Sequence, residues 1–207
     1  MVDTRIDPAT RRALHGVAEL LVAGPQYRAH GTIRLAVDAG GFAGTVLRVG
    51  VRGAELVWPG GHAALNGRTC AELGALASVD PGVPEGLYRD TSGVGLDEPL
   101  TVDVDTATRY LEWFSLGDKA LRLFAPEQTP VLWPEHFDLG IIVGAANYGV
   151  SLGDDEIAEP YAYIGPHTPQ TGPFWNASFG AARTAADLPT VEAVAAFFAE
   201  GRDRGEA

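Results

Sequence analysis

The chain has 207 residues, and with 46% hydrophobic and 20% charged residues it can bury a substantial core, which excludes a disordered protein. Its 15 basic and 27 acidic residues give a formal net charge of −12, which disfavours binding to nucleic acid and to anionic membrane surfaces.

The N-terminal segment is predicted to form an amphipathic helix. Asp7 can cap the free backbone N–H groups, and Pro8 suits the first helical position. The Gly-Pro pair at 24–25 predicts the end of this helix. Because His15 and Glu19 interrupt the apolar run, we interpret it as part of the mature protein and not as an export signal.

The rest of the first half predicts strands followed by a second helix. Alternating apolar residues and Gly-containing turns indicate strands at 32–38, 46–51, 54–58 and 62–65. A helix is expected over 69–79. Residues 80–99 contain many Pro and Gly residues and no periodic pattern, and irregular segments of this length are often functional or mobile.

The second half repeats this order coarsely. Asp105 is predicted to cap a helix that ends near two prolines, 126 and 130. Strands are expected at 131–133, 137–143, 148–151, 161–164 and 174–183. Thr190 is predicted to cap a last helix, which Gly201 would close.

These elements predict an α+β fold, with antiparallel sheet strands and helices packed on one face. We expect residues 1–207 to form a single compact domain, in which coarse halves 1–100 and 101–207, each a helix–strands–helix arrangement, share one core. Strands do not alternate with long helices, which argues against a Rossmann fold or a TIM barrel.

The cysteine content and the hydropathy of the chain indicate the cellular compartment of the protein. Cys70 is the only cysteine, so no intrachain disulfide is possible, and we expect a buried, inert thiol. No apolar run approaches the roughly 18 residues of a membrane span. The sequence therefore predicts a soluble, cytoplasmic protein with no membrane partner.

The common catalytic and cofactor motifs are absent. The chain has no phosphate-binding loop, no Gly-x-Ser-x-Gly nucleophile turn, no Cys-x-x-Cys pair and no His-Glu-x-x-His helix. The cofactor is therefore unknown, with a divalent metal left open.

A His-x-Asp pair stands in the predicted strand 137–143 and the residue before it. Side chains two apart share a strand face, which places His136 with Asp138 opposite the apolar residues that fill the core. The pair can ligate a metal, act as an oriented acid–base pair, or lie on the surface without a role. His136 and Asp138 are the candidate catalytic residues.

A second set of candidates could line a ligand pocket. Glu159, Tyr161 and Tyr163 would share one face of a strand, either lining a polar pocket or facing solvent. Trp175 and Asn176 could add an aromatic wall and a polar contact, or simply form the edge of a core.

The loop that follows Tyr163 carries one further histidine. His167, after a Gly-Pro turn, is either a further metal ligand or a plain loop histidine.

Three segments, 129–141, 159–167 and 174–183, carry these residues. They resemble an uncharacterised protein family of high-GC, actinobacterial-type bacteria to which no activity is assigned, and the likeness covers most of the chain. The resemblance implies no reaction.

Two classes of function remain open from the sequence. The first is a small-molecule-binding protein or enzyme with a polar and aromatic pocket centred on His136, Asp138, Glu159 and Tyr161. The second is a non-catalytic interaction or structural protein that uses the sheet or the segment 80–99. The oligomeric state is not predicted.

Overall fold

The structure is a computed structural model that describes residues 7–38, 40–89 and 91–205. By the density of its contacts the chain divides into two units. The first takes the described residues up to Glu112 together with Leu132–Phe137, and the second takes Trp113–Val131 and residues 138–205. Residues 101–112 and 132–137 thus fall in the first unit.

The strands of the first unit form an antiparallel arrangement in the order β6-β1-β2-β3-β4-β5. They are β1 (Leu35–Asp38), β2 (Gly41–Gly44), β3 (Gly50–Arg52), β4 (Glu55–Trp58), β5 (Gly61–Ala64) and β6 (Val131–Trp133). The sequence pattern placed a strand over 46–51, but residues 45–47 form a bend and Val46 is exposed. The strand begins only at Gly50.

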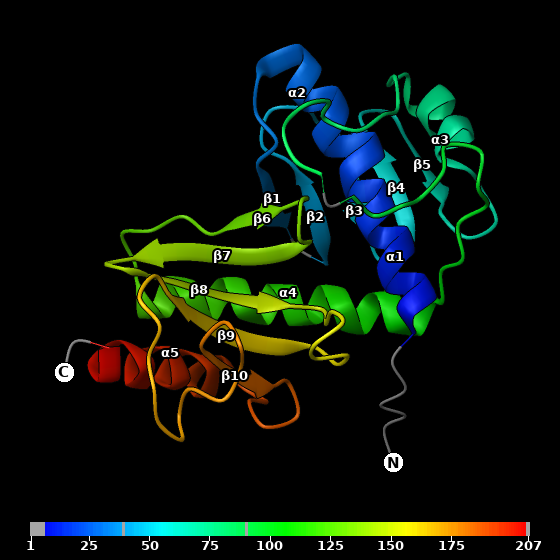
Figure 1. The fold of residues 1–207 in the computed structure, drawn as a ribbon. Helices are drawn as coiled ribbons and strands as arrows, with labels where there is room; N and C mark the ends of the chain where they lie inside the picture. The colour runs from blue at the N-terminus through cyan, green and yellow to red at the C-terminus, as the bar shows by residue number, and fades with distance from the viewer. Residues whose placement is uncertain (1–6, 39, 90, 206–207) are drawn as a thin grey trace. The chain divides into compact units, whose positions relative to one another are not determined.

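The helices of the first unit are α1 (Pro8–Val17), the π-helix η1 (Ala18–Ala23), α2 (Gly24–His30) and α3 (Cys70–Ala77). η1 lies against β2 and β3, and α3 against β4 and β5 (Figure 1). Side chains of both layers are fully buried between them, including Leu14, Leu21, Phe42, Leu56 and Leu73.

The predicted cap at Asp7 is confirmed. The Asp7 side chain accepts a hydrogen bond from Ala9 N at 3.1 Å. Thr69 and Glu72 form a reciprocal capping box at the start of α3.

The predicted end of the first helix at 24–25 is wrong. The backbone continues through a π-helix into α2, which ends at Gly31, where φ is 71°. Pro25 has no N–H, so it cannot bond to an upstream carbonyl, and the wider π turn lets Gly24 N bond to Glu19 O instead.

The second unit contains an antiparallel set of strands in the order β7-β8-β9-β10. The strands are β7 (Asp138–Val143), β8 (Ala146–Ser151), β9 (Tyr161–Pro166) and β10 (Ala181–Thr184). Gly149 pairs with Gly140 on one side and Tyr163 on the other.

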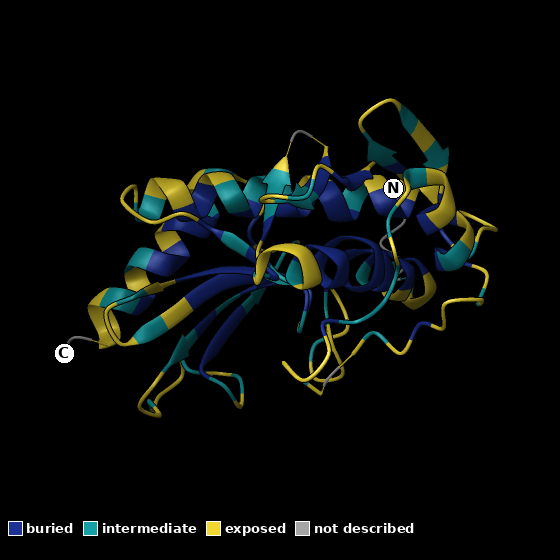
Figure 2. Cartoon of the chain, turned by 90° about the horizontal axis from the view of Figure 1, so that it is seen from above, coloured by how far each residue is buried: buried dark blue, intermediate teal, exposed yellow. Residues whose placement is uncertain are grey.

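Two helices cover one face of these strands: α5 (Val191–Gly205) and the part of α4 (Val104–Phe124) that begins at Trp113. The approach is close, because a Cβ on Gly117 would lie 2.3 Å from Val150 Cγ2. Figure 2 shows the buried residues following the strands and the helix faces.

Two helix boundaries differ from prediction. Asp103, and not Asp105, accepts the hydrogen bond from Thr106 N at the start of α4. Thr190 caps α5 as predicted, but Gly201 does not end it. Gly201 is buried inside α5, where the missing side chain lets the helix approach Ile164.

Together the strands and helices give an α+β fold, as predicted. None of the helices in the described part of the chain combines the length and apolar character that a bilayer crossing requires.

Candidate functional site

A polar cluster of one buried and four half-buried residues lies in the first unit, where α1 and η1 meet the segment 80–99. We call it the Glu19 cluster; its residues are Arg11, His15, Glu19, Tyr88 and Ser92. Glu19 lies in the π-helix and is only 1% exposed. Its Oε2 accepts hydrogen bonds from Ser92 N at 3.1 Å and Ser92 Oγ at 2.7 Å.

The other carboxylate oxygen of Glu19 is the unusual atom of this cluster. Oε1 and the Tyr88 hydroxyl are both buried, and neither meets strict hydrogen-bond geometry with another described residue. The two groups are neighbours, because the pKa of Tyr88 is raised by burial, then by the charge of Glu19 and by a side-chain hydrogen bond with Glu19. The phenol is a donor and the carboxylate is an acceptor, so Tyr88 is the protein group that can satisfy Oε1.

His15 connects the cluster to the turn at 134–137. Its ring stacks on Phe137 with centroids 5.3 Å apart and planes 2° apart. Nε2 lies 2.6 Å from the Pro134 carbonyl oxygen, and since a carbonyl only accepts, Nε2 carries the proton. Burial lowers the pKa of His15.

Arg11 stands one helical turn before His15. Its Nη1 is buried without a partner among the described residues. Its positive charge lowers the pKa of His15, which places the guanidinium close to the imidazole.

The segment 80–99 covers this helix face at three points. The π-helix leaves the Leu20 carbonyl without its usual partner, and Gly82 N donates to it at 2.9 Å. Val94 packs against Gly16, where a Cβ would lie 2.6 Å from Val94 Cγ2. Between these two contacts, Ser92 donates its two hydrogen bonds to Glu19.

His136 lies in a turn beside this cluster and not in a strand. β6 ends at Trp133 and β7 begins at Asp138, so the reasoning that put His136 and Asp138 on one strand face is wrong. Phe137 has a φ of 51°, which breaks the alternation of a strand. The His136 side chain is 64% exposed and its Nε2 is 3.8 Å from Glu135 Oε1.

Asp138 belongs to a different group of residues, in the second unit. The Tyr163 hydroxyl donates to Asp138 Oδ2, and the Tyr161 hydroxyl donates to Asp154 Oδ2. Phe179 lies over both rings, with centroids 6.0 Å from Tyr161 and 6.3 Å from Tyr163. Burial, and then the neighbouring aspartates, raise the pKa of both phenols, which keeps them as donors.

Two glycines explain how Tyr163 reaches Asp138. A Cβ on Gly149 would lie 2.5 Å from the Tyr163 hydroxyl, and one on Gly140 would lie 2.9 Å from it. Tyr163 therefore fills the space beside Asp138.

The remaining predicted residues lie in the bend before β9 and in the loop before β10. Glu159 is exposed in the bend before β9, which corrects the prediction that it shares a strand face with Tyr161. Trp175 packs on Phe174 with centroids 5.0 Å apart. Asn176 is exposed, and its Oδ1 accepts from Ala182 N at 3.0 Å. Their roles in ligand binding stay predictions.

The structure also bears on possible metal ligands and on the single cysteine. Across residues 7–38, 40–89 and 91–205, no three His, Cys, Asp or Glu side chains are grouped as a metal ion would require. The metal roles of His136 and of the exposed His167 stay predictions. Cys70 is buried, and burial raises the pKa of its thiol to about 12, as expected for an inert thiol.

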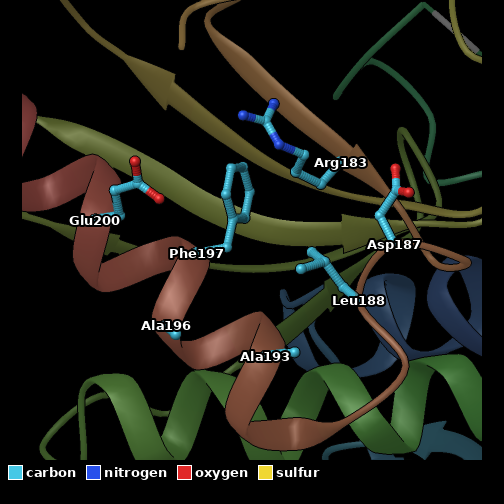
Figure 3. Close-up of a pocket in the computed structure, with 7 residues that line it drawn as sticks. All are labelled: Arg183, Asp187, Leu188, Ala193, Ala196, Phe197 and Glu200. Atoms are coloured by element: carbon cyan, nitrogen blue, oxygen red, sulfur yellow. The ribbon is translucent and has the colours of Figure 1, made fainter.

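An open pocket of about 490 Å³ lies in the second unit, between α5 and β10 (Figure 3). The Arg183 guanidinium lies over the ring of Phe197 at 5.5 Å and that of Phe174 at 5.4 Å. None of the residues that line the pocket was a predicted site residue. They are Arg183, Asp187, Leu188, Ala193, Ala196, Phe197 and Glu200.

The sequence did contain a signal for the Glu19 cluster. Glu19 is the only charged residue between Val17 and Ala23, a run that is otherwise apolar. It stands four residues after His15, which places both on one helix face. The contacts with Tyr88 and Ser92 had no such signal, because they join residues about 70 positions apart.

Comparison of the chain with protein-family models, curated proteins and solved structures found no match.

Proposed function

We propose that the protein binds a small polar molecule at the Glu19 cluster. The observation that carries this proposal is the carboxylate of Glu19, which is only 1% exposed in a π-helical turn, bonded to Ser92 and adjacent to the Tyr88 phenol. A buried carboxylate is costly unless polar groups compensate it. A bound molecule that donates to Oε1 beside the phenol would add to this compensation.

The backbone around Glu19 supports the same interpretation. Single π-helical turns inside α-helices are frequent at functional sites. Here the π-helix places a carboxylate on the buried side of the helix, facing the segment 80–99. A purely structural helix of this length would be expected to have an apolar residue at a position that is only 1% exposed.

The segment 80–99 covers the Glu19 cluster. Its described residues form no helix or strand. It is held by Gly82 N bonded to Leu20 O, by Ser92 bonded to Glu19, and by Val94 packed against Gly16. The cluster is therefore covered by irregular chain and not by a helix or strand.

The test is amide NMR of the labelled protein against a library of small polar compounds. We expect at least one compound to shift the amides of Glu19 and Ser92, and the variant Glu19→Leu to lose this response while keeping its fold. Asp118→Asn is the matched control, since Asp118 Oδ1 is also buried and unpaired among the described residues. If every binding compound shifts other regions alone, the Glu19 cluster is structural.

A further inference from the structure

The pocket between α5 and β10 in the second unit combines charged side chains with apolar surface (Figure 3). Its volume of about 490 Å³ lies within the range of small-molecule sites, about 300–1,000 Å³. Leu188 and Phe197 are buried members of its lining, and Ala193 and Ala196 of α5 add small apolar side chains. A ligand of this pocket therefore needs an apolar part as well as polar groups.

Arg183 is a half-buried cation of this pocket without a counter-charge. Its guanidinium lies over the rings of Phe174 and Phe197, and Nη1 donates to neutral oxygens, Ala182 O at 2.8 Å and Asn176 Oδ1 at 3.3 Å. Arg183 takes part in none of the ion pairs that join described residues of the second unit. Nε and Nη2 share one edge of the guanidinium, and this edge can bind a carboxylate through two parallel hydrogen bonds.

Asp187 is the opposite charge of the pocket. It is exposed, its Oδ2 accepts from Thr184 Oγ1 at 3.0 Å, and no cation among the second unit's described residues pairs with it. Glu200, the third charged residue of the lining, is paired with Arg204 at 2.7 Å. The pocket thus presents one uncompensated positive charge and one uncompensated negative charge, which form no ion pair with each other.

An extended peptide added to β10 is the alternative occupant, because β10 lies at the end of the strand order. The outward backbone groups of this strand already have partners in the protein. Ala182 N donates to Asn176 Oδ1 at 3.0 Å, Ala182 O accepts from Arg183, and Thr184 O accepts from Asp187 N at 3.1 Å. Strand addition would first have to break these bonds, which favours a small molecule.

We propose that this pocket binds a small zwitterion of the α-amino-acid type with an apolar side chain. The ligand's carboxylate accepts from Nε and Nη2 of Arg183, its ammonium group donates to Asp187, and its apolar part packs on Leu188 and Phe197. A molecule with a single charge would compensate only one of the two side chains. The site lies in the second unit and is independent of the Glu19 cluster.

The experiment compares zwitterions with relatives that lack one charged group. One trio is phenylalanine, 2-phenylethylamine and 3-phenylpropionate, and the other is leucine, 3-methylbutylamine and 4-methylpentanoate. Amide NMR of the labelled full chain at pH 7 maps each compound and measures its affinity. We expect the zwitterions to shift residues 183–200 with a Kd of about 1 mM or below. They should bind about tenfold more tightly than the amines, and a few-fold more tightly than the acids because Asp187 is exposed.

Two variants assign the charged contacts. Arg183→Gln keeps a donor for the Ala182 carbonyl, and phenylalanine should then bind no better than 2-phenylethylamine. Asp187→Asn keeps an acceptor for the Thr184 hydroxyl, and phenylalanine should then bind no better than 3-phenylpropionate. The control is Glu127→Gln, which removes an exposed carboxylate of the second unit outside the pocket lining and should change neither ratio.

A third variant keeps the test decisive if Arg183→Gln does not fold. Ala196 is exposed on α5 and lines the pocket, so Ala196→Phe fills the pocket from the surface and should weaken phenylalanine binding about tenfold or more. Unchanged phenylalanine binding in this variant would overturn the inference. So would amines or acids that bind the wild type as tightly as the zwitterions, or no shift of residues 183–200 at about 10 mM phenylalanine.

Discussion

At the scale of single residues, burial controls the protonation of His15. The half-buried imidazole lies between α1 and the turn at 134–137, and burial is the main cause that lowers its pKa, against the opposing effects of the Pro134 carbonyl and Glu19. Arg11 and His136 also lower it by charge. The folded protein therefore holds His15 neutral at a pH where the same residue in the unfolded chain takes up a proton.

This difference predicts a pH-dependent stability. A histidine whose folded pKa is lowered stabilises the fold fully above its unfolded pKa, about 6.5, and loses that contribution as the pH falls below it. We expect the free energy of unfolding to decrease between pH 7 and 5, with a contribution from His15 of up to about 1.4 kcal/mol per pH unit.

The measurement is urea unfolding of the wild type and His15→Gln across this pH range. The glutamine keeps a donor for the Pro134 carbonyl but does not titrate, so the variant should show a shallower slope than the wild type. His62→Gln serves as the control, since His62 is exposed on β5. Equal slopes in the wild type and in His15→Gln would contradict the prediction.

At the scale of elements, glycines set how closely helices and strands approach. Gly201 of α5 faces Ile164 of β9, and a Cβ at this position would lie 2.1 Å from Ile164 Cδ1. Gly205 lies on the same helix with no atom within 4 Å of its added Cβ. Both glycines belong to α5, Gly201 in its interior and Gly205 at its end, and only Gly201 is packed against another element.

The pair provides a matched test of this packing. We expect Gly201→Ala to destabilise the protein by about 1–2 kcal/mol, because the overpacking exceeds the gain in helix propensity. Gly205→Ala should be neutral or stabilising by up to about 1 kcal/mol. Chemical unfolding of both variants measures the difference.

A compensating change checks the mechanism of this effect. Ile164→Val removes the Cδ1 atom that the new methyl group would meet, so it should restore part of the stability lost in Gly201→Ala. Additive losses in the double variant would show that the helix–strand contact is not the cause.

The π-helix is the other feature that is best understood at the element scale. Pro25 removes one N–H, the Gly24 N–H shifts to Glu19 O, and the Leu20 carbonyl turns to Gly82. A local defect in one helix thereby anchors a distant irregular segment and brings Ser92 and Tyr88 to Glu19.

At the scale of the whole molecule, the chain passes between its two units at three places. Residues 104–112 of α4 belong to the first unit and its residues from Trp113 onward to the second, while residues 132–137 return to the first. Because α4 runs through both units, no flexible linker separates them. One unit therefore cannot unfold without disrupting α4.

We predict from this continuity that thermal unfolding shows a single transition. The calorimetric enthalpy should equal the van't Hoff enthalpy, as in a two-state protein. Circular dichroism at far and near ultraviolet wavelengths should report the same midpoint. Two resolved transitions would show that the units unfold independently.

The sequence by itself determined the features that depend on near neighbours. The caps at Asp7 and Thr190, the α+β class and most strands follow from propensities and periodicities within a few residues. Where local signals conflicted with packing, the predictions were wrong. The sequence predicts a helix end at Gly201, but this residue is inside α5 and packs against Ile164. The predicted strand alternation before Asp138 is broken by the positive φ of Phe137.

Only the tertiary structure decided which polar groups meet. Tyr163 bonds to Asp138 because two glycines on neighbouring strands leave room for its ring, a fact that depends on strand register. Glu19 meets Ser92 and Tyr88 because a π-helix and a long irregular segment lie together, across a separation of about 70 residues. Such contacts are selected by the packing of the whole core, and no local sequence pattern encodes a pairing at that distance.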